Sequence, residues 1–262
     1  MRNIIIILLL LINSFIYANE KIVKIATLED YAPFCISNQD TPITQTINIG
    51  DYGVEFSGYS WDIVRTSFQE MGYTIQLTVV PWARGLEYIQ KGKVDLLFPA
   101  GKNADREKVF DFPNEYVNKA TFVIYLREKD NIKWENLESL KGLTIGVKRK
   151  FYYGDKWKEA TGIIEYNVKT IEQGFRMLDA KRFDGFLGYE YNWDFVLKKL
   201  SWKNKFRKLP VFDSSIEYLV ALKTNPKGKK FLKDFDIGKE KLRKNGKLKK
   251  IKNKWNYDDF GE

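Results

Sequence analysis

The chain has 262 residues, 44% of them apolar and 15% aromatic, and a formal net charge of +10, so it can bury a large core and is unlike a disordered sequence. It contains no histidine and a single cysteine, Cys35. These counts exclude Ser-His-Asp and Cys-His nucleophile pairs, histidine-containing metal sites, an intrachain disulfide and thiolate zinc clusters. We therefore expect one or two folded domains and no metal or other cofactor.

Residues 1–18 have the layout of a cleavable signal peptide. Arg2 precedes nine uninterrupted apolar residues at 4–12, and a short polar and aromatic stretch ends at Ala18. Nine apolar residues cover about half of the ~20 that a membrane-spanning helix needs, which argues against a membrane anchor. No cysteine follows the apolar run, so a lipid anchor is also disfavoured. We expect cleavage after Ala18, with the bulky Ile16 leaving the cut site open, and a periplasmic location.

Strands and helices alternate through the first half of the chain. Residues 22–28 form an apolar, β-branched run that is typical of a buried strand. Similar patterns then predict a helix at 60–71, a strand at 74–80, a helix at 83–91 and a strand at 94–98. This order implies a mostly parallel sheet with helices on both faces.

The connection at 35–57 is much longer than the usual ~4 to 6 residues between elements. It is rich in Asn, Asp, Thr and Gly and has no strong period. Long loops of this kind are often functional lids or decorations. The simplest interpretation here is a small hairpin through 47–56.

The alternation recurs in the second half of the chain, which suggests a second lobe. The predicted elements are strands at 121–126, 143–147 and 163–168, a helix at 170–181 and a strand at 186–189. A last strand at 217–222 has no obvious place in this second unit. We expect it to return to the first one.

The basic excess lies in one C-terminal segment, 223–254, which holds 14 Lys and Arg against 3 Asp and Glu. Apolar residues recur there at helical spacing, so the sequence predicts two helices whose lysines face solvent. Weak attraction to an anionic membrane or partner surface is the alternative use of this charge. Nucleic-acid binding is disfavoured, because an exported protein rarely meets nucleic acid and no base-stacking element accompanies the lysines.

The order of motifs resembles the family 3 extracellular solute-binding proteins, the periplasmic proteins of polar amino-acid uptake systems, over nearly the whole mature chain. The matching pieces are, in order, TLEDYAPF at 27–34, GYSWD at 58–62, GKVD at 92–95, ADRE at 104–107 followed by FDF at 110–112, LKGLTIGV at 140–147, FDG at 183–185 and GKLKKIKNKW at 246–255. Each piece alone is weak, but seven in this order are specific.

The resemblance implies an α/β fold of the two-lobe periplasmic binding protein type (type II), with mixed, mostly parallel sheets and two hinge crossovers. Lobe 1 would comprise 19–118 and 215–262, and lobe 2 would comprise 119–214. The crossovers are expected near 118–122 and 211–215. A ligand bound between the lobes would favour the closed form.

The resemblance also indicates candidate ligand-binding residues. Tyr31, just past the first strand, matches an aromatic residue that stacks on the ligand, and Trp82 matches a residue that lines the cleft. Arg84 follows Trp82 at the start of a helix, where backbone N–H groups favour an anion. Arg106 matches the arginine that holds the ligand carboxylate, because a guanidinium offers a planar fork to two oxygens. Its alternative role is a surface ion pair with Asp105 or Glu107.

Departures from the family pattern concern the groups that bind the ligand ammonium. Pro99 and Gly101 stand where relatives carry small hydroxyl residues, and the turn around Tyr152 is aromatic. The usual acidic residue falls at Tyr189, with Glu190 one position along. We therefore expect a carboxylate or other anion with a flat or apolar part, bound by Arg106 and Arg84 between Tyr31, Trp82 and Tyr152. An ordinary α-amino acid stays possible if Glu190 supplies the acid.

Three classes of function compete. The first is a monomeric binding protein that delivers a carboxylate or amino-acid-like solute to an ABC-type permease, or presents it to a membrane receptor as a sensor would. The second is an exported enzyme similar to cyclohexadienyl dehydratase, which would need an acid such as Glu190, Asp30 or Glu29. The third is a surface-interaction protein that acts through its basic C-terminus. We expect the first class, without enzymatic activity.

Overall fold

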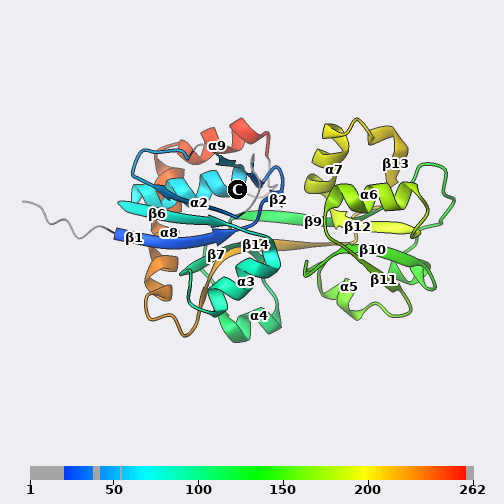
Figure 1. Ribbon diagram of the computed structural model, residues 1–262, viewed down its shortest axis with the longest axis horizontal. Coiled ribbons are helices and arrows are strands. Elements are labelled where there is room, and N and C mark those ends of the chain that lie inside the picture. The colour runs from blue at the N-terminus through cyan, green and yellow to red at the C-terminus, as the bar shows by residue number, and fades with distance from the viewer. Residues whose placement is uncertain (1–20, 38–41, 54, 258–262) are drawn as a thin grey trace, which may run out of the picture.

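Two long antiparallel strands, β9 (Asn118–Arg127) and β14 (Asp213–Leu222), cross the middle of the molecule and join its two lobes (Figure 1). They pair with each other only between residues 118–122 of β9 and 213–217 of β14. The computed structural model describes residues 21–37, 42–53 and 55–257. The expected signal peptide at 1–18 lies outside these residues. The predicted crossover at 118–122 coincides with the paired part of β9, and the one at 211–215 overlaps the paired part of β14 at 213–215.

A single mixed sheet runs through both lobes in the order β11-β10-β12-β9-β14-β7-β1-β6-β4, with β8 beside β14 and β13 beside β9. In lobe 1, β1 pairs in parallel with both β6 and β7. In lobe 2, β10 pairs in parallel with both β11 and β12. The strands are β1 (Lys21–Thr27), β4 (Ile43–Ile47), β6 (Tyr73–Val79), β7 (Leu96–Gly101), β8 (Phe110–Asp111), β10 (Thr144–Lys148), β11 (Ile164–Val168), β12 (Gly185–Tyr189) and β13 (Phe206–Lys208).

Helices cover both faces of the sheet in each lobe, as the apolar strand patterns predicted (Figure 1). In lobe 1, α2 and α3 lie on opposite faces, and in lobe 2, α6 and α5 do. The helices are α2 (Tyr59–Glu70), α3 (Trp82–Gln90), α4 (Ala104–Val109), α5 (Asp155–Glu159), α6 (Ile171–Asp179), α7 (Glu190–Lys199), α8 (Gly228–Lys244) and α9 (Lys247–Trp255), with short 3-10 turns η1 (Leu137–Leu140) and η2 (Lys203–Lys205).

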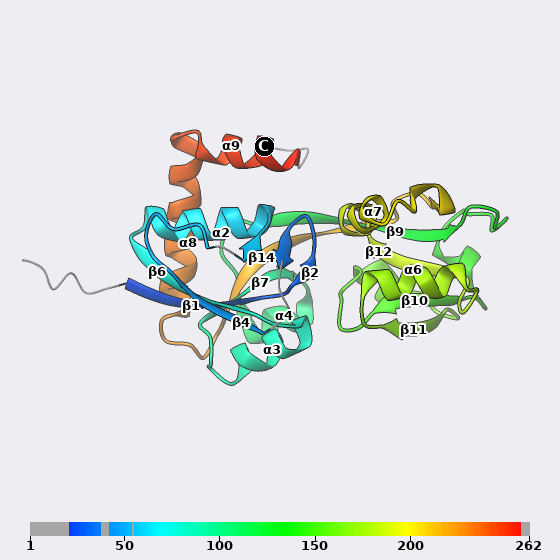
Figure 2. The ribbon, with the colours of Figure 1, turned by 45° about the horizontal axis from the view of Figure 1, so that its top comes forward.

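The basic C-terminal segment forms the two predicted helices, with α8 along the outer side of lobe 1 and α9 across its top (Figure 2). Their apolar residues, Phe235 and Leu248 among them, are buried against the lobe. Most of the lysines face solvent. Lys239 is an exception, since it is 1% exposed and donates a hydrogen bond to the Tyr116 carbonyl at 2.9 Å. The lysine-rich segment is therefore packed on lobe 1, and Lys239 bonds it to the residues just before β9.

The predicted hairpin through 47–56 is wrong. Instead β4 pairs antiparallel with β6 and extends the main sheet, while β5 joins a separate small sheet in the order β2-β3-β5. Ile43 and Ile47 of β4 are both buried, so this pairing removes their apolar side chains from water. The small strands are β2 (Asp30–Tyr31), β3 (Cys35–Ser37) and β5 (Phe56–Ser57).

In the described residues no helix is both long and apolar enough to cross a bilayer. The same residues contain no cluster of three or more acidic or cysteine side chains arranged to hold a metal ion.

The core of lobe 2 depends on close contact between α6 and β12. A methyl group at Gly174 would lie 2.2 Å from Cζ of Phe186, so we expect Gly174→Ala to lower the free energy of unfolding by roughly 1–3 kcal/mol through overpacking. Phe186→Leu in the same chain should recover part of this loss, because the smaller side chain leaves room for the methyl group. Denaturant unfolding of both single variants and the double variant measures the coupling. Strict additivity would contradict the proposed contact.

Candidate functional site

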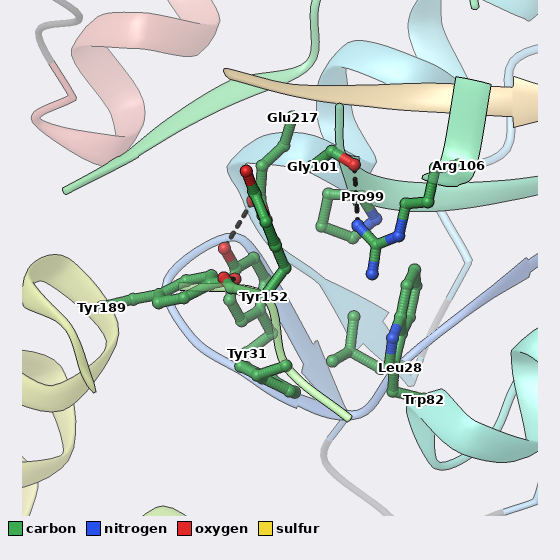
Figure 3. A pocket seen from close by; sticks show the side chains of 10 residues that line it. Leu28, Tyr31, Trp82, Pro99, Gly101, Arg106, Tyr152, Tyr189 and Glu217 are labelled. Carbon is green, nitrogen blue, oxygen red and sulfur yellow. Dashed lines mark hydrogen bonds between the residues drawn. The ribbon is translucent and has the colours of Figure 1, made fainter. Parts of the chain in front are cut away.

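A small cavity lies where the two lobes meet, at the carboxyl ends of the parallel strands (Figure 3). It holds about 260 Å³ of atom-free space, with the open solvent at its mouth included. Most of this space is too narrow to admit a water molecule, so the lobes as they stand enclose little room for a ligand. Its lining residues are Leu28, Tyr31, Trp82, Pro99, Gly101, Arg106, Phe151, Tyr152, Tyr189 and Glu217.

The chain brings these residues together through the strand ends. Trp82 begins α3 directly after β6, and Gly101 is the last residue of β7. Tyr189 is the last residue of β12, and Tyr152 follows β10. Because parallel strands end at the same edge of a sheet, each lobe presents its loops to one crevice.

Arg106 supplies the positive charge of the cavity. Its Nη1 donates a hydrogen bond to the Gly101 carbonyl at 2.7 Å, and Figure 3 shows the guanidinium reaching over Trp82. The guanidinium carbon lies 5.6 Å from the centroid of the Trp82 ring and 5.9 Å from that of Tyr152. Burial lowers the pKa of Arg106 from its usual value, although the guanidinium stays charged near neutral pH.

No carboxylate neutralises Arg106 in the part of the chain that the structure describes. Its neighbours on α4 bind lysines instead: Asp105 pairs with Lys158 at 2.8 Å, and Glu107 pairs with Lys102 at 3.1 Å. The alternative role of Arg106 in a surface ion pair with these acids is therefore wrong. Nη2 and Nε also make no hydrogen bond with any described residue. The cavity thus contains a guanidinium whose free edge lacks an anion.

Glu217 on β14 is the acidic group of the cavity and is only 3% exposed. The Tyr31 hydroxyl donates a hydrogen bond to its Oε2, and Asn118 Nδ2 donates to the same oxygen at 2.6 Å. Burial raises the pKa of Glu217 to about 7, against the smaller lowering effects of these two hydrogen bonds and of Arg106. Among described residues, none donates a hydrogen bond to its other oxygen, Oε1.

The hydrogen bonds of Glu217 connect the cavity to the crossing of the two long strands. Glu217 lies opposite Asn118 in the β9–β14 ladder. The Asn118 side chain in turn accepts a hydrogen bond from Ser60 Oγ at 2.8 Å, at the start of α2. Side-chain hydrogen bonds therefore link this lining residue of the cavity to the strand crossing and to α2.

Aromatic rings from both lobes form the opposite wall. The centroid of the Tyr31 ring of lobe 1 lies 6.0 Å from that of Phe151 and 5.7 Å from that of Tyr189, both in lobe 2. Both pairs of rings are edge to face. The Tyr189 hydroxyl donates to the Tyr152 carbonyl. Burial raises the pKa of Tyr31 and of Tyr189, so both phenols stay neutral. This wall can receive an apolar or flat part of a ligand.

Polar contacts beside the cavity hold the lobes together. Lys148 Nζ of lobe 2 donates to the carbonyl and to the carboxylate of Asp30 of lobe 1, both at 2.9 Å. Asn192 Nδ2 donates to the Ala32 carbonyl at 2.8 Å. The structure therefore has the lobes in contact around the site.

Six of the eight residues expected from the sequence line the cavity, namely Tyr31, Trp82, Gly101, Arg106, Tyr152 and Tyr189. Whether they bind a ligand stays a prediction. Arg84 lies outside the lining and is exposed, because two positions along a helix turn a side chain by about 200° from Trp82. Glu190 lies outside as well: it accepts a hydrogen bond from Lys208 at 2.6 Å.

The sequence reasoning missed Glu217, together with Leu28, Pro99 and Phe151 as lining residues. A signal for Glu217 was present, since it is the one charged residue between Ser214 and Leu222, in a strand that is otherwise largely apolar. A charged group in a buried strand is expensive unless it has partners or a function. Pro99 and the aromatic turn around Tyr152, which contains Phe151, were noted only as departures from the family pattern.

Comparison with known proteins identifies the family and the fold. Residues 23–258 match the model of the bacterial extracellular solute-binding proteins, family 3. The L-cystine-binding protein TcyJ of Bacillus subtilis is 25% identical over 216 residues, which cover 79% of this chain and 78% of TcyJ. An ancestral arginine-binding protein, solved with arginine bound, has a TM-score of 0.74 at 17% identity and covers 92% of this chain and 99% of its own. The ancestral amino-acid-binding protein AncCDT-1, a precursor of cyclohexadienyl dehydratase, has a TM-score of 0.70 at 18% identity, covering 90% and 95%.

The buried carboxyl predicts a specific dependence of stability on pH. Because the pKa of Glu217 is about 7 in the folded chain against a model value of 4.5, the folded state binds more protons between these pH values. The free energy of unfolding contributed by this group therefore falls by roughly 3 kcal/mol as pH rises from about 4.5 to about 7, and is level above.

We expect Glu217→Gln to remove this fall, because the amide does not titrate and can still accept the hydrogen bonds from Tyr31 and Asn118. Denaturant unfolding of the ligand-free protein between pH 4.5 and 8 measures the effect. Glu107→Gln, at an exposed carboxyl, is the matched control. Parallel curves for the wild type and Glu217→Gln would show that Glu217 titrates as a solvated carboxyl.

Proposed function

The chain belongs to the bacterial extracellular solute-binding proteins of family 3, and from this we propose that it captures a small amino-acid-like carboxylate between its lobes and delivers it to an ABC-type importer. The type II periplasmic binding protein fold supports this, as does the relatives' binding of L-cystine and arginine. We further propose that residues 19–118 with 215–262, and residues 119–214, move as the two lobes.

The observation that carries the proposal is the free edge of Arg106. Arg106 is partly buried, so its guanidinium has lost some of its hydration without gaining an anion, and a carboxylate offers two oxygens to its planar fork. The two rings beside it, Trp82 and Tyr152, come from different lobes and limit where the carboxylate can lie. A ligand held there would touch both lobes.

Contact with both lobes gives binding its effect on conformation. A ligand that touches Tyr31 and Trp82 of lobe 1 and Tyr152 and Tyr189 of lobe 2 gains its full set of contacts only when the lobes are closed. Its affinity for the closed form then exceeds that for the open form, and this difference drives closure. The closed form is what an importer or a membrane receptor recognises.

Extracytoplasmic location follows from the family. We propose in addition that residues 1–18 are a cleaved signal peptide, that the mature protein is a periplasmic monomer, and that its partner is a membrane permease. A sensor that presents the same ligand to a receptor would use the same cavity. The dehydratase alternative receives no support through Glu190, whose carboxylate is bound to Lys208 outside the cavity.

Arg106→Lys tests the capture of a carboxylate. Lysine keeps the charge but cannot present two parallel N–H groups, so we expect at least tenfold weaker binding. A thermal-shift screen of the standard L-amino acids and L-cystine identifies binders, since a ligand at 100 times its Kd adds about 2.7 kcal/mol of stability. Calorimetry then gives Kd for both proteins.

Arg84→Lys, two residues after Trp82 but outside the cavity, is the matched control. Equal losses in both variants, or none in Arg106→Lys, would refute the assignment.

Asp30→Ala tests the closure mechanism. This change removes the ion pair with Lys148 between the lobes but no lining residue of the cavity. We expect the ligand-free protein to populate open forms more, with a larger radius of gyration in X-ray scattering, and ligand affinity to fall two- to tenfold. Glu172→Ala, which breaks an ion pair with Arg176 inside α6, is the control. An unchanged radius of gyration would argue that the ion pair does not hold the lobes closed.

A further inference from the structure

We propose that Glu217 receives a cationic group of the ligand, so that the cavity selects a zwitterion over a simple carboxylate. This inference rests on the proposed capture of a carboxylate by Arg106 and adds a second, oppositely charged contact. It also revises the expectation that groups for a ligand ammonium are mostly missing from this chain.

The geometry of the cavity supports this assignment. Arg106 and Glu217 both line it, yet they form no ion pair with each other among the described residues. Each keeps unused hydrogen-bonding atoms: the Nε and Nη2 groups of Arg106 and the Oε1 atom of Glu217. A ligand with a carboxylate at one end and a cation nearby can bind the unused atoms of Arg106 and of Glu217 at the same time.

The partners of Glu217 orient it for this role. Tyr31 and Asn118 both donate to Oε2, so one oxygen is anchored and the other is left for a donor from the cavity. An ammonium group is a donor only, which is the type of partner that Oε1 lacks. Asn118 is itself held by Ser60 Oγ at 2.8 Å, so the anchoring extends into α2.

The other acids near the cavity are engaged elsewhere or do not line it. Asp30 is paired with Lys148 and Glu190 with Lys208. Glu29 does not line the cavity. Among the described residues, Glu217 is therefore the only carboxylate in the lining.

The balance of charge in the cavity explains why a zwitterion would bind better than a simple anion. An anion without a cationic group would place its charge near Arg106 but leave Glu217 either charged and repelled or protonated. The titratable groups that face Glu217 are Arg106 on α4, Tyr31 on β2, Cys35 on β3 and Tyr189 on β12. Arg106 is the only cation of this set. A zwitterion adds no net charge to the cavity and contributes the missing cation.

The test compares each standard L-amino acid with the 2-hydroxy acid of the same side chain, in which a hydroxyl replaces the ammonium. For the wild type we expect the amino acid that binds to have at least 100-fold lower Kd than its hydroxy acid. In Glu217→Gln this ratio should fall at least tenfold, because the neutral amide no longer attracts the ammonium. Glu190→Gln, an acid near the cavity but outside it, should keep the wild-type ratio.

A second measurement needs no variant. Binding of an ammonium group favours the charged form of Glu217, whose pKa is about 7 in the free protein. Calorimetry of the wild type with the amino acid, in buffers of different ionisation enthalpy, should therefore show release of nearly one proton at pH 6 and almost none at pH 8.5.

The outcomes separate this inference from the proposed function. Equal affinity for amino acids and hydroxy acids, both lost in Arg106→Lys, would overturn the role of Glu217 and leave carboxylate capture intact. An amino-acid preference that survives in Glu217→Gln would overturn it as well. Binding of neither class, at any pH tested, would overturn both.

Discussion

The paired segment of β9 and β14 is the constraint on which the rest of the structure depends. Only five residue pairs, from Asn118 with Glu217 to Phe122 with Asp213, join the strands before each continues into its own lobe. The chain must therefore pass from lobe 1 to lobe 2 and back, and the final strand and helices must belong to lobe 1. Glu217, a lining residue of the cavity, is part of this ladder, so the cavity borders directly on the crossing of the two strands.

The cavity keeps two opposite charges apart at that crossing. Arg106 is held by the Gly101 carbonyl and Glu217 by Tyr31 and Asn118, and neither neutralises the other. Each pays a desolvation cost that a direct ion pair would reduce. Such an arrangement is poor for stability alone and suits a site in which the ligand supplies both countercharges. Rings of both lobes form the aromatic wall, so a small molecule held there, as proposed, would touch both lobes.

Local sequence patterns were sufficient to locate helices and strands, but not to tell which strands pair with each other. The apolar run at 22–28 and the helical spacing at 60–71 correspond to β1 and α2 within one residue. The hairpin expected at 47–56 was wrong, because strand pairing depends on which surfaces the fold brings together, and the partner of β4 is β6, about 30 residues along the chain. In the site, motif order indicated Arg106, Trp82 and Tyr31. Glu217 was missed because its importance comes from residues about 100 to 190 positions away.

The sequence by itself determined the absence of histidine and disulfide chemistry, the α/β alternation, the family and most of the residues at the strand ends, since all of these follow from composition and local order. Only the tertiary structure decided which side chains share the cavity. A one-residue step from Tyr189 to Glu190 moves a side chain out of the site, and two residues from Trp82 to Arg84 do the same. Side-chain direction, the lack of an anion at Arg106 and the burial of Glu217 are properties of packing between distant segments, which local sequence patterns do not specify.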